Sequence, residues 1–383
     1  MCLVFHGLTD VPGALEGVLV VSLEQAVAAP FCTQRLADAG ARVIKIEREG
    51  GETARHYDTT VQGTSAYFAW LNRGKESAVL DLKAPQDMAL FQAMLGRADV
   101  LVQNLIPGAM ARMGLDADSV AARFPRLIVA NIVGYGQDTA YAGMRAYDML
   151  VQAESGIAGV TGTPDQACKI GVSAADISTG LTAYAAVLEA LIARGITGRG
   201  SQVDVAMFDV MADWMTVPLL YHEQAGRVTY RHGLAHAVIY PYGPMICADG
   251  TLVVAVQNNA EWARFCAEVL HRPALATDPR FATNADRATH RTALDAEIAP
   301  SVAALTMAGM IARLEAGRIA WGRLSTVADL AAHPALRRMA VPLSDGATVT
   351  MPRPPGRNAD FTSGAVPETG TATDRLRAEF SPT

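Results

Sequence analysis

The sequence predicts an α/β protein with a doubly wound, largely parallel sheet and a smaller α+β domain. Short aliphatic runs alternate with amphipathic helical segments from residue 15 to about residue 136, at the spacing of βαβ units. Around Gly226 the pattern changes to loops, a hairpin and a helix-rich segment. We therefore expect a large domain from residues 1–225 and 325–383, and a small domain from residues 226–324.

Composition limits the functions that are open to this chain. With 383 residues, half of them hydrophobic, it is long enough for two domains with a sizeable core. The net charge of -6 argues against a general nucleic-acid surface, so a polyanionic ligand would need a local cluster of Lys and Arg. Five cysteines without CxxC pairs indicate reduced thiols in the cytoplasm. Residues 1–17 lack a signal-peptide pattern, and no apolar run approaches ~18 residues, so we expect neither export nor membrane spanning.

The first elements form a βαβ opening. A buried strand at residues 17–23, a helix from near Pro30 and a strand at residues 41–48 resemble half of a Rossmann unit. The turn from Glu24 to Ala29 lacks the glycines that let backbone approach a pyrophosphate, so NAD is not expected. Arg48, directly after the second strand, offers a fork of donors to phosphate oxygens.

The alternation then continues along the chain. A polar loop at residues 50–65 is followed by a helical segment at 65–77, a helix at 86–98, a strand at 99–105, a short helix carrying Arg112, a helix at 116–124 and a strand at 127–136. Ligands of such sheets gather at the carboxyl ends of the strands. Arg48, Asn104 and Gly134–Gly136 follow strand ends, so we expect one crevice to collect them.

Asp176 lies in the first turn of a predicted helix that begins near residue 174. Apolar residues recur at helical spacing from Leu181 to Ile192. Unpaired N–H groups and the helix dipole favour an ionised carboxylate there, which suits an anionic nucleophile. The alternative is structural, because Ser173 and Asp176 also fit the Ser-x-x-Asp form of a capping box.

The remaining elements complete the prediction. In order, we expect helical structure at residues 146–162, a glycine-rich turn at 195–200, a long helix at 203–226, a hairpin turning at Asp249-Gly250, a helix at 259–272, helices to about 317, strands and turns at 341–356, and a final helix. The methionines of the 203–226 helix are typical of core packing.

Two signals compete with the Asp176 interpretation. His232 and His236 lie four residues apart, but Gly233 separates them and no third ligand follows at a metal-site spacing, so no metal is expected. Gly171-x-Ser173-x-Ala175 falls one residue short of a nucleophile elbow and precedes a helix. A serine thioesterase therefore stays open as an alternative.

Ordered motifs along the chain resemble the class III CoA-transferases, the formyl-CoA and carnitine CoA-transferase family. The motifs are LEQAVAAPFCTQRLADAGARVIKIER, WLNRGKESAVLDLK, DVLVQNLIPGAMARMGL, RAYDMLVQAESG, VSAADISTGLTAYAAVLEALIAR and TGRGSQVDVAMFD, and they span most of residues 15–270. The resemblance implies a Rossmann-like large domain and an interlocked, ring-like homodimer. It also implies a CoA thioester as substrate, with no permanently bound cofactor.

The resemblance implies roles for individual residues. Asp176 matches the catalytic aspartate that forms anhydride and aspartyl-CoA thioester intermediates, and Gln25 matches a glutamine beside the reacting thioester. Phosphate-binding positions of the family match Arg48, Lys75 and Arg112. Pocket-lining positions match Leu71, Asn104, Arg145 and Tyr147.

The same resemblance leaves the substrates open. The family also contains α-methylacyl-CoA racemases, which place a histidine where Tyr147 stands, and a phenol is a poor acid/base substitute. SLEQAVAAPFCT, AHAVIYPYGP and VQNNAEWARFC look most like the branch that uses itaconate, citramalate, mesaconate or malate, with succinyl-CoA as donor. The formyl-CoA transferases' glycine-rich loop has no obvious counterpart after Gly226. Candidates to bind the acceptor's second carboxylate are Arg231, His232, His236 and Tyr240. A racemase or thioesterase on this frame, and an acyl-CoA-binding protein without activity, remain alternatives.

Overall fold

The computed structural model describes residues 13–381, so Cys2 and the predicted unexported start of the chain lie outside the described residues. The chain forms two compact units, each described by itself below. Unit 1 comprises residues up to 157, residues 170–217 and residues from 337 onward, and unit 2 comprises residues 158–169 and 218–336. The predicted domain boundaries at residues 226 and 324 stay a prediction.

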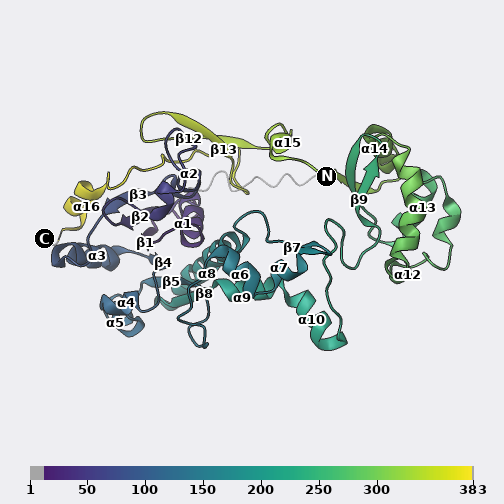
Figure 1. The fold of residues 1–383 in the computed structure, drawn as a ribbon. Helices are drawn as coiled ribbons and strands as arrows, with labels where there is room; N and C mark the ends of the chain where they lie inside the picture. Colours follow the sequence, from purple (N-terminus) through teal and green to yellow (C-terminus); the bar gives the residue numbers. More distant parts are fainter. Residues whose placement is uncertain (1–12, 382–383) are drawn as a thin grey trace. The chain divides into compact units, whose positions relative to one another are not determined.

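A six-stranded parallel sheet is the centre of unit 1, as predicted (Figure 1). Its order is β3-β2-β1-β4-β5-β8, the order of a doubly wound nucleotide-binding fold. The strands are β1 Leu19–Leu23, β2 Arg42–Glu47, β3 Glu76–Val79, β4 Val100–Gln103, β5 Ile128–Val133 and β8 Gln202–Ala206. The strand order reverses between β1 and β4, so their carboxyl ends mark the expected ligand crevice.

Helices cover both faces of this sheet because its strands are apolar on both sides. Val20 packs with α1 (Ala28–Asp38) and α8 (Ala174–Thr197) in one buried cluster. Val21, the next residue, packs with α3 (Pro85–Arg97), α5 (Ala117–Arg123) and α16 (Thr373–Phe380) in another. Successive strand side chains point to opposite faces, which explains the continuous apolar runs in the sequence.

The α8 helix is fixed at two places. Near its start, a Cβ on Gly180 would lie 2.4 Å from the carbonyl oxygen of Ala28, so only glycine permits this approach to α1. At its end, Arg194 donates to the Asp99 carboxylate at 2.8 Å and to the carbonyls of Asp99 and Arg126. α8 is long and apolar enough to cross a membrane by length and composition alone. Its packing against α1 is that of the core helix of a globular domain.

The other elements of unit 1 lie around the sheet. They are η2 Thr53–His56, α2 Ala66–Asn72, α4 Ala109–Arg112, α6 Asp148–Glu154, α9 Met207–Trp214, and the antiparallel pair β12 Arg338–Pro342 and β13 Thr348–Pro352. Two helices cross the unit boundaries, α7 Ile157–Val160 and α10 Thr216–Ala225.

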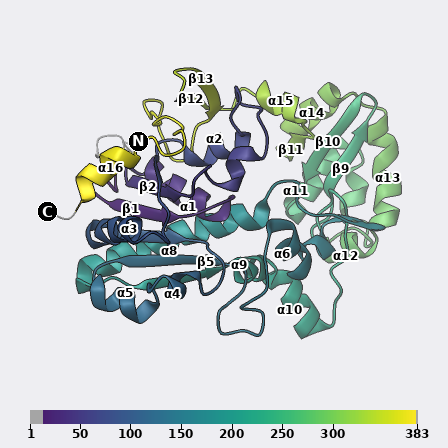
Figure 2. The ribbon, with the colours of Figure 1, turned by 60° about the vertical axis from the view of Figure 1, so that its left-hand side comes forward.

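Unit 2 contains the three-stranded antiparallel sheet β11-β10-β9 and most of the late helices (Figure 2). Cys247 pairs with Gly250 across the predicted Asp249-Gly250 turn, which confirms the hairpin. The elements are β6 Gly162–Thr163, β7 Gln166–Ala167, β9 Tyr242–Cys247, β10 Gly250–Ala255, α11 Asn259–Arg264, the π-helix η3 Phe265–Val269, η4 Pro273–Ala276, α12 Asn284–Thr289, α13 Arg291–Ala303, α14 Met307–Ala316, β11 Ala320–Arg323 and α15 Val327–Ala331.

The structure corrects four of the predicted helices. The 65–77 segment is helical only to Asn72, because residues 76 and 77 belong to β3. The 259–272 segment is α-helical only to Arg264, where the π-helix η3 follows. Residues 203–206 of the predicted 203–226 helix belong to the edge strand β8, because Val203 and Val205 extend the sheet beside β5. The rest of that segment breaks at Met215 into α9 and α10. The helical segment predicted at residues 146–162 is interrupted at Gly156, whose φ of 84° ends α6 and allows α7 to begin in a new direction.

Candidate active site

A cavity of about 880 Å³ lies at the carboxyl ends of the first four strands of the sheet. Its lining comes from the segments that follow β1, β2, β3 and β4 and includes Leu23, Gln25, Arg48, Leu80, Leu82, Lys83, Leu105 and Arg112. The switch point of the strand order therefore carries a crevice, as predicted, and Arg48 lines it together with Gln25 and Arg112. The prediction that the same crevice collects Asn104 and Gly134–Gly136 is wrong, because these residues do not line it.

Three cations make this cavity suitable for phosphate groups. Arg48, Lys83 and Arg112 are exposed in its lining. Gly108 is the N-cap of α4 and has a φ of 76°. A Cβ added at this position would lie 3.1 Å from a guanidinium nitrogen of Arg112, so the glycine leaves room for this side chain. Asp81 is an exposed carboxylate beside them, and its Oδ1 accepts the Lys83 N–H. The other acids of the lining, Glu24, Glu47 and Glu52, are buried and paired with Lys or Arg.

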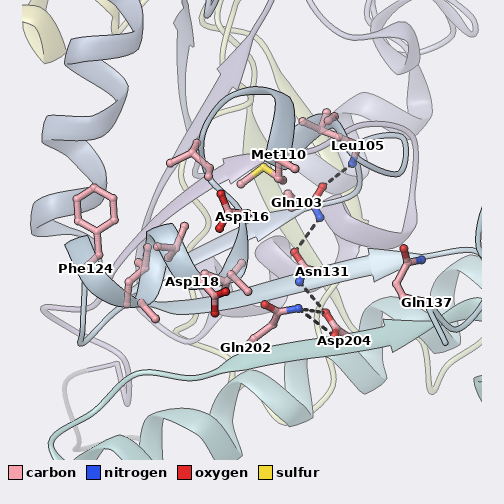
Figure 3. A pocket seen from close by; sticks show the side chains of 18 of the residues that line it. Gln103, Leu105, Met110, Asp116, Asp118, Phe124, Asn131, Gln137, Gln202 and Asp204 are labelled. Carbon is pink, nitrogen blue, oxygen red and sulfur yellow. Dashed lines mark hydrogen bonds between the residues drawn. The ribbon is translucent and has the colours of Figure 1, made fainter.

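A second cavity, of about 450 Å³, adjoins the first, since Leu105 and Ala109 line both. Figure 3 shows side chains that line this second cavity. Its floor is a chain of hydrogen bonds across β4, β5 and β8, formed by Gln103, Asn131, Asp204 and Gln202. Its lining contains Arg199 and the carboxylates of Asp116, Asp118 and Asp204. The excess of negative charge disfavours a polyphosphate, so the larger cavity fits such a ligand better.

Lys75 and Leu71, both predicted to bind the ligand, do not line the larger cavity. The Lys75 ammonium is buried and donates to Glu24, Thr33, Asn72 and the carbonyl of Pro30, at 2.7 to 3.2 Å. An ammonium has three N–H donors, so none is left for a phosphate. Burial also lowers the pKa of Lys75 to about 8, against the attraction of Glu24. Leu71 is fully buried and packs with Val27 and Phe31.

The Gln25–Ala26 turn is held by its backbone and leaves the Gln25 side chain free. Asn104 accepts the Gln25 N–H at 3.0 Å and donates to the Gln25 carbonyl at 2.9 Å. Glu52 accepts the Ala26 N–H at 2.8 Å. Ala26 has a φ of 62°, a left-handed conformation that costs a non-glycine residue about 1–2 kcal/mol. The exposed Gln25 amide has no hydrogen-bond partner among residues 13–381.

The start of α8 differs from the capping box that the sequence allows. Ser173 is the N-cap but makes no side-chain capping bond. Asp148, in the first turn of α6, accepts the Ala175 N–H at 2.8 Å and the Asp176 N–H at 3.4 Å instead. The capping interpretation of Ser173 and Asp176 is therefore wrong. Within the described part of the chain, no group hydrogen-bonds the Asp176 carboxylate.

The protonation of Asp176 also differs from the prediction. Burial, followed by the nearby Asp148 charge, raises the pKa of Asp176 to about 7. The start of α8 therefore does not favour the ionised form as expected, because burial opposes the charge and because Asp148 accepts the N–H groups of Ala175 and Asp176. Near pH 7, Asp176 is divided between a protonated form and a reactive, partly desolvated carboxylate.

Packing brings the start of α8 close to the Gln25 turn. Ile177, next to Asp176, packs with Val27, two residues after Gln25. Tyr57 lies in the same region, and burial, followed by the charges of Glu52 and Asp176, raises its pKa. One region of unit 1 therefore contains Asp176, the Gln25 turn and a phenol that the sequence did not indicate.

Arg145 and Tyr147 follow the carboxyl end of β5. A Cβ on Gly134, directly after β5, would lie 2.2 Å from the Cβ of Ala146, so this glycine allows the 145–147 segment to approach the strand end. Arg145 is exposed, and Tyr147, the N-cap of α6, is 67% exposed. The predicted Gly134–Gly136 signal thus corresponds to a close backbone approach.

The acceptor-binding residues predicted in unit 2 have internal partners. Arg231 donates to the carbonyls of Gly159, Thr163 and Pro164. The Nδ1 atom of His236 accepts two backbone N–H groups, and its ring stacks on Tyr242. The Tyr240 hydroxyl donates to Asp295. His232 faces Arg291. These side chains therefore make contacts within unit 2, and His232 also lines a cavity of about 240 Å³ together with Arg227. Their role in binding the acceptor stays a prediction.

The sequence analysis missed three residues that the geometry singles out. Lys83 could have been found, because it lies four residues after β3, on the segment that leaves the carboxyl end of that strand. Asp148 is part of a quoted motif, but only the meeting of α6 and α8 gives it a role. Glu52 lies in a glycine-rich loop, and its contact with Ala26 joins residues 26 positions apart.

A parallel sheet with a cationic cavity at its carboxyl edge defines an α/β enzyme for phosphate-bearing ligands. A family model described as CoA-transferase family III matches residues 15–373. The chain belongs to this family, and it is a CoA-transferase that uses CoA thioesters as substrates.

Named relatives support this assignment. The chain is 34% identical to a succinate–glutarate CoA-transferase of Agrobacterium fabrum, over 91% of each protein. It is 37% identical to an acetyl-CoA:oxalate CoA-transferase of Acetobacter aceti, over 84% of this chain and 83% of that protein. The crystal structure of a CAIB/BAIF family protein from Brucella suis matches with a TM-score of 0.80 and 33% identity, over 96% of this chain and 99% of that one.

Proposed function

We propose that this enzyme moves CoA from succinyl-CoA to a short dicarboxylic acid, with Asp176 as the covalent nucleophile. The observation that carries the proposal is the Asp176 carboxylate, partly buried beside the Gln25 turn and free of hydrogen-bond partners within residues 13–381. A carboxylate that is neither paired nor fully solvated is poised to attack a carbonyl carbon.

The proposed reaction proceeds through two covalent intermediates. The Asp176 carboxylate attacks the thioester carbonyl, which expels CoA thiolate and leaves a mixed anhydride. The thiolate attacks the aspartyl carbonyl of the anhydride, which releases the donor acid and leaves an aspartyl-CoA thioester. The acceptor carboxylate then displaces thiolate to form a second anhydride. Attack of the thiolate on the acceptor carbonyl gives the new acyl-CoA and restores Asp176. The free Gln25 amide can donate to oxyanions that form along this path.

The cationic cavity is the proposed site of the CoA nucleotide. Arg48, Lys83 and Arg112 hold the phosphates, and Lys83 takes the role that the sequence assigned to Lys75. Leu80 and Leu82, which line this cavity, replace Leu71 as its apolar surface. Asn104 contributes indirectly by holding the Gln25 backbone.

The dicarboxylate class rests on the relatives. The names of two relatives contain succinate, glutarate and oxalate, all of them dicarboxylates. Itaconate, mesaconate, citramalate and malate complete the acceptor panel that the sequence suggests.

A homodimer is proposed because apolar side chains of unit 1 lie exposed in the single chain. On α8, Leu181 is 51% exposed, Ile192 is 68% and Ile196 is 83%. Trp214 of α9 is 53% exposed. Exposed apolar side chains that gather into a large patch mark an interaction surface, and the interlocked ring implied by the sequence motifs provides a partner to cover these. Light scattering on the purified protein tests the dimer, and a monomer at micromolar concentration would refute it.

A turnover screen tests the proposed reaction. Purified enzyme is incubated with succinyl-CoA and each acid of a panel: glutarate, oxalate, itaconate, mesaconate, citramalate, malate and carnitine. We expect mass spectrometry to detect a new dicarboxyl-CoA that Asp176→Asn does not form. Transfer that persists in Asp176→Asn would refute the nucleophile. Loss of α-carbon chirality in a branched acyl-CoA, without transfer to any acid, would identify a racemase instead.

A further inference from the structure

Four buried charges lie beneath the Gln25–Ala26 turn, and the proposed chemistry uses none of them directly. They are Glu24, Lys45, Glu52 and Lys75, whose side chains are at most 4% exposed. Each comes from a different segment: Glu24 directly follows β1, Lys45 lies in the middle of β2, Glu52 directly precedes η2 and Lys75 directly precedes β3. Two acids and two bases balance, so the cluster is neutral as a whole.

The contacts between these four side chains form a chain that leads from Lys75 to the Gln25–Ala26 turn. Lys75 binds Glu24 at 2.7 Å, and Glu24 lies 3.4 Å from the Lys45 ammonium. Lys45 binds one oxygen of Glu52 at 2.5 Å. The other oxygen of Glu52 accepts the Ala26 N–H at 2.8 Å. The cluster therefore ends on the peptide of the one residue in this turn with a left-handed backbone.

Stability alone does not account for this arrangement. Desolvation of buried ions offsets most of their mutual attraction, and apolar side chains of similar volume often stabilise a core as well or better. A strained backbone conformation, by contrast, persists only where the surroundings impose it, and such residues gather at functional sites. Glu52 supplies that constraint at Ala26, next to Gln25.

We infer that Glu52, held by Lys45, is a positioning residue for the transfer reaction. Its carboxylate fixes the Ala26 peptide in the left-handed conformation, and this directs the neighbouring Gln25 side chain toward the reacting thioester. Asn104 fixes the other side of the same turn. The inference rests on the proposed role of Gln25 in the transferase reaction.

Glu52→Asp tests the inference with the charge balance kept. The shorter carboxylate can still pair with Lys45 but cannot also reach the Ala26 N–H. We expect kcat to fall at least about tenfold, while KM for the acyl-CoA changes less than about threefold and the melting temperature stays near that of the parent. Glu49→Asp, the same change at an exposed position three residues earlier, should leave kcat unchanged.

A second substitution separates positioning from structural support. Glycine adopts the left-handed conformation without penalty, so Ala26→Gly should restore a substantial part of the kcat lost in Glu52→Asp. Unchanged kcat in Glu52→Asp would overturn the inference. A fall in kcat that is accompanied by a matching fall in melting temperature, and that Ala26→Gly does not restore, would also overturn the inference. The cluster would then have only a structural role.

Hydrogen exchange keeps this test independent of the acceptor. If the parent enzyme transfers CoA to no acid of the panel, the proposed substrate class is wrong, but the turn can still be examined. Amides in residues 24–27 should exchange faster in Glu52→Asp than in the parent and in Glu49→Asp. Equal exchange in all three proteins would overturn the role of Glu52.

Discussion

Two groups of buried carboxylates in unit 1 have charged neighbours of opposite sign. Glu24 and Glu52 each bind a lysine, and although burial opposes it, Lys75 and Lys45 hold the pKa of Glu24 below its usual range. Asp176 has another carboxylate, Asp148, as its charged neighbour, and its pKa rises to about 7. Burial is common to both groups, so the charge partner decides whether a carboxylate supports the structure or stays reactive.

The largest effect should come from removing the reactive member of this comparison. Asp176→Asn should reduce transfer by about three orders of magnitude or more, because the covalent route is lost. It should also stabilise the protein, since the folded state resists ionisation of Asp176. This gain should be absent near pH 4, grow as the pH rises toward 7, and reach on the order of 2–4 kcal/mol above that.

Urea unfolding at pH 4.5, 6 and 8 measures this gain. Asp165→Asn, a change at an exposed loop carboxylate, is the control and should not show the trend. A stability difference that is independent of pH would mean that Asp176 ionises freely in the folded protein.

The next effect concerns a supporting member of the buried cluster. Lys45→Met leaves Glu52 and Glu24 short of a cation in the core, and this should lower the free energy of unfolding by about 3–5 kcal/mol. The double variant Lys45→Met/Glu52→Gln removes both charges and should recover part of that loss. Chemical denaturation of the parent, of Lys45→Met, of Glu52→Gln and of the double variant measures the coupling, and additive losses would show that the two side chains do not act as a pair.

Two lysines that lie eight residues apart sharpen the contrast between structure and binding. Lys83→Met should raise KM for acyl-CoA about tenfold with little change in melting temperature, because an exposed charge-assisted contact to phosphate is lost. Lys75→Met should instead lower the melting temperature. Steady-state kinetics at two salt concentrations, with thermal melts, distinguish the two roles. Equal KM values for Lys83→Met and the parent would remove Lys83 from the CoA site.

The smallest effect is a shift in pH dependence. Activity should rise with pH through about 7 as Asp176 loses its proton. Asp148→Asn removes the neighbouring charge but keeps an oxygen that can cap α8, so this acid limb should move down by about one pH unit. Burial, the larger cause, remains. A limb that does not move in the kcat/KM profile would assign the ionisation to another group.

Much of unit 1 could be predicted because its signals are local. Alternating apolar segments gave the parallel sheet, and the rule that ligands bind at strand ends gave the crevice with Arg48. The edge strand β8 was not predicted, since Val203 and Val205 pair with β5 through contacts between distant parts of the chain. In the sequence, these residues and the α9 residues that follow them form one continuous helical pattern.

The details of the site depend on contacts between distant segments. Lys75 and Lys83 flank the same strand, and nothing in the local sequence distinguishes their roles. Only the fold shows that Lys75 belongs to a buried cluster and that Lys83 lines the cavity. Ser173 has the correct spacing to cap α8, but the Asp148 carboxylate, 27 positions from Ala175, makes that bond. The resemblance to a family supplied the role of Asp176, which spacing alone left open.

The anchoring of α8 has a mechanical consequence. Asp176 and Arg194 are 18 residues apart on one helix, roughly 27 Å at 1.5 Å per residue. About one degree of pivoting at the Arg194 end would therefore displace the nucleophile by about 0.5 Å, and a misplacement of about 1 Å can slow an enzyme about a hundredfold. The close packing of Gly180 against Ala28 of α1 is a second fixed point and limits this displacement. The position of the reactive carboxylate is thus set partly by contacts of Arg194 with Asp99 and Arg126, which precede β4 and β5 and so lie at the amino-terminal edge of the sheet, away from the ligand crevice.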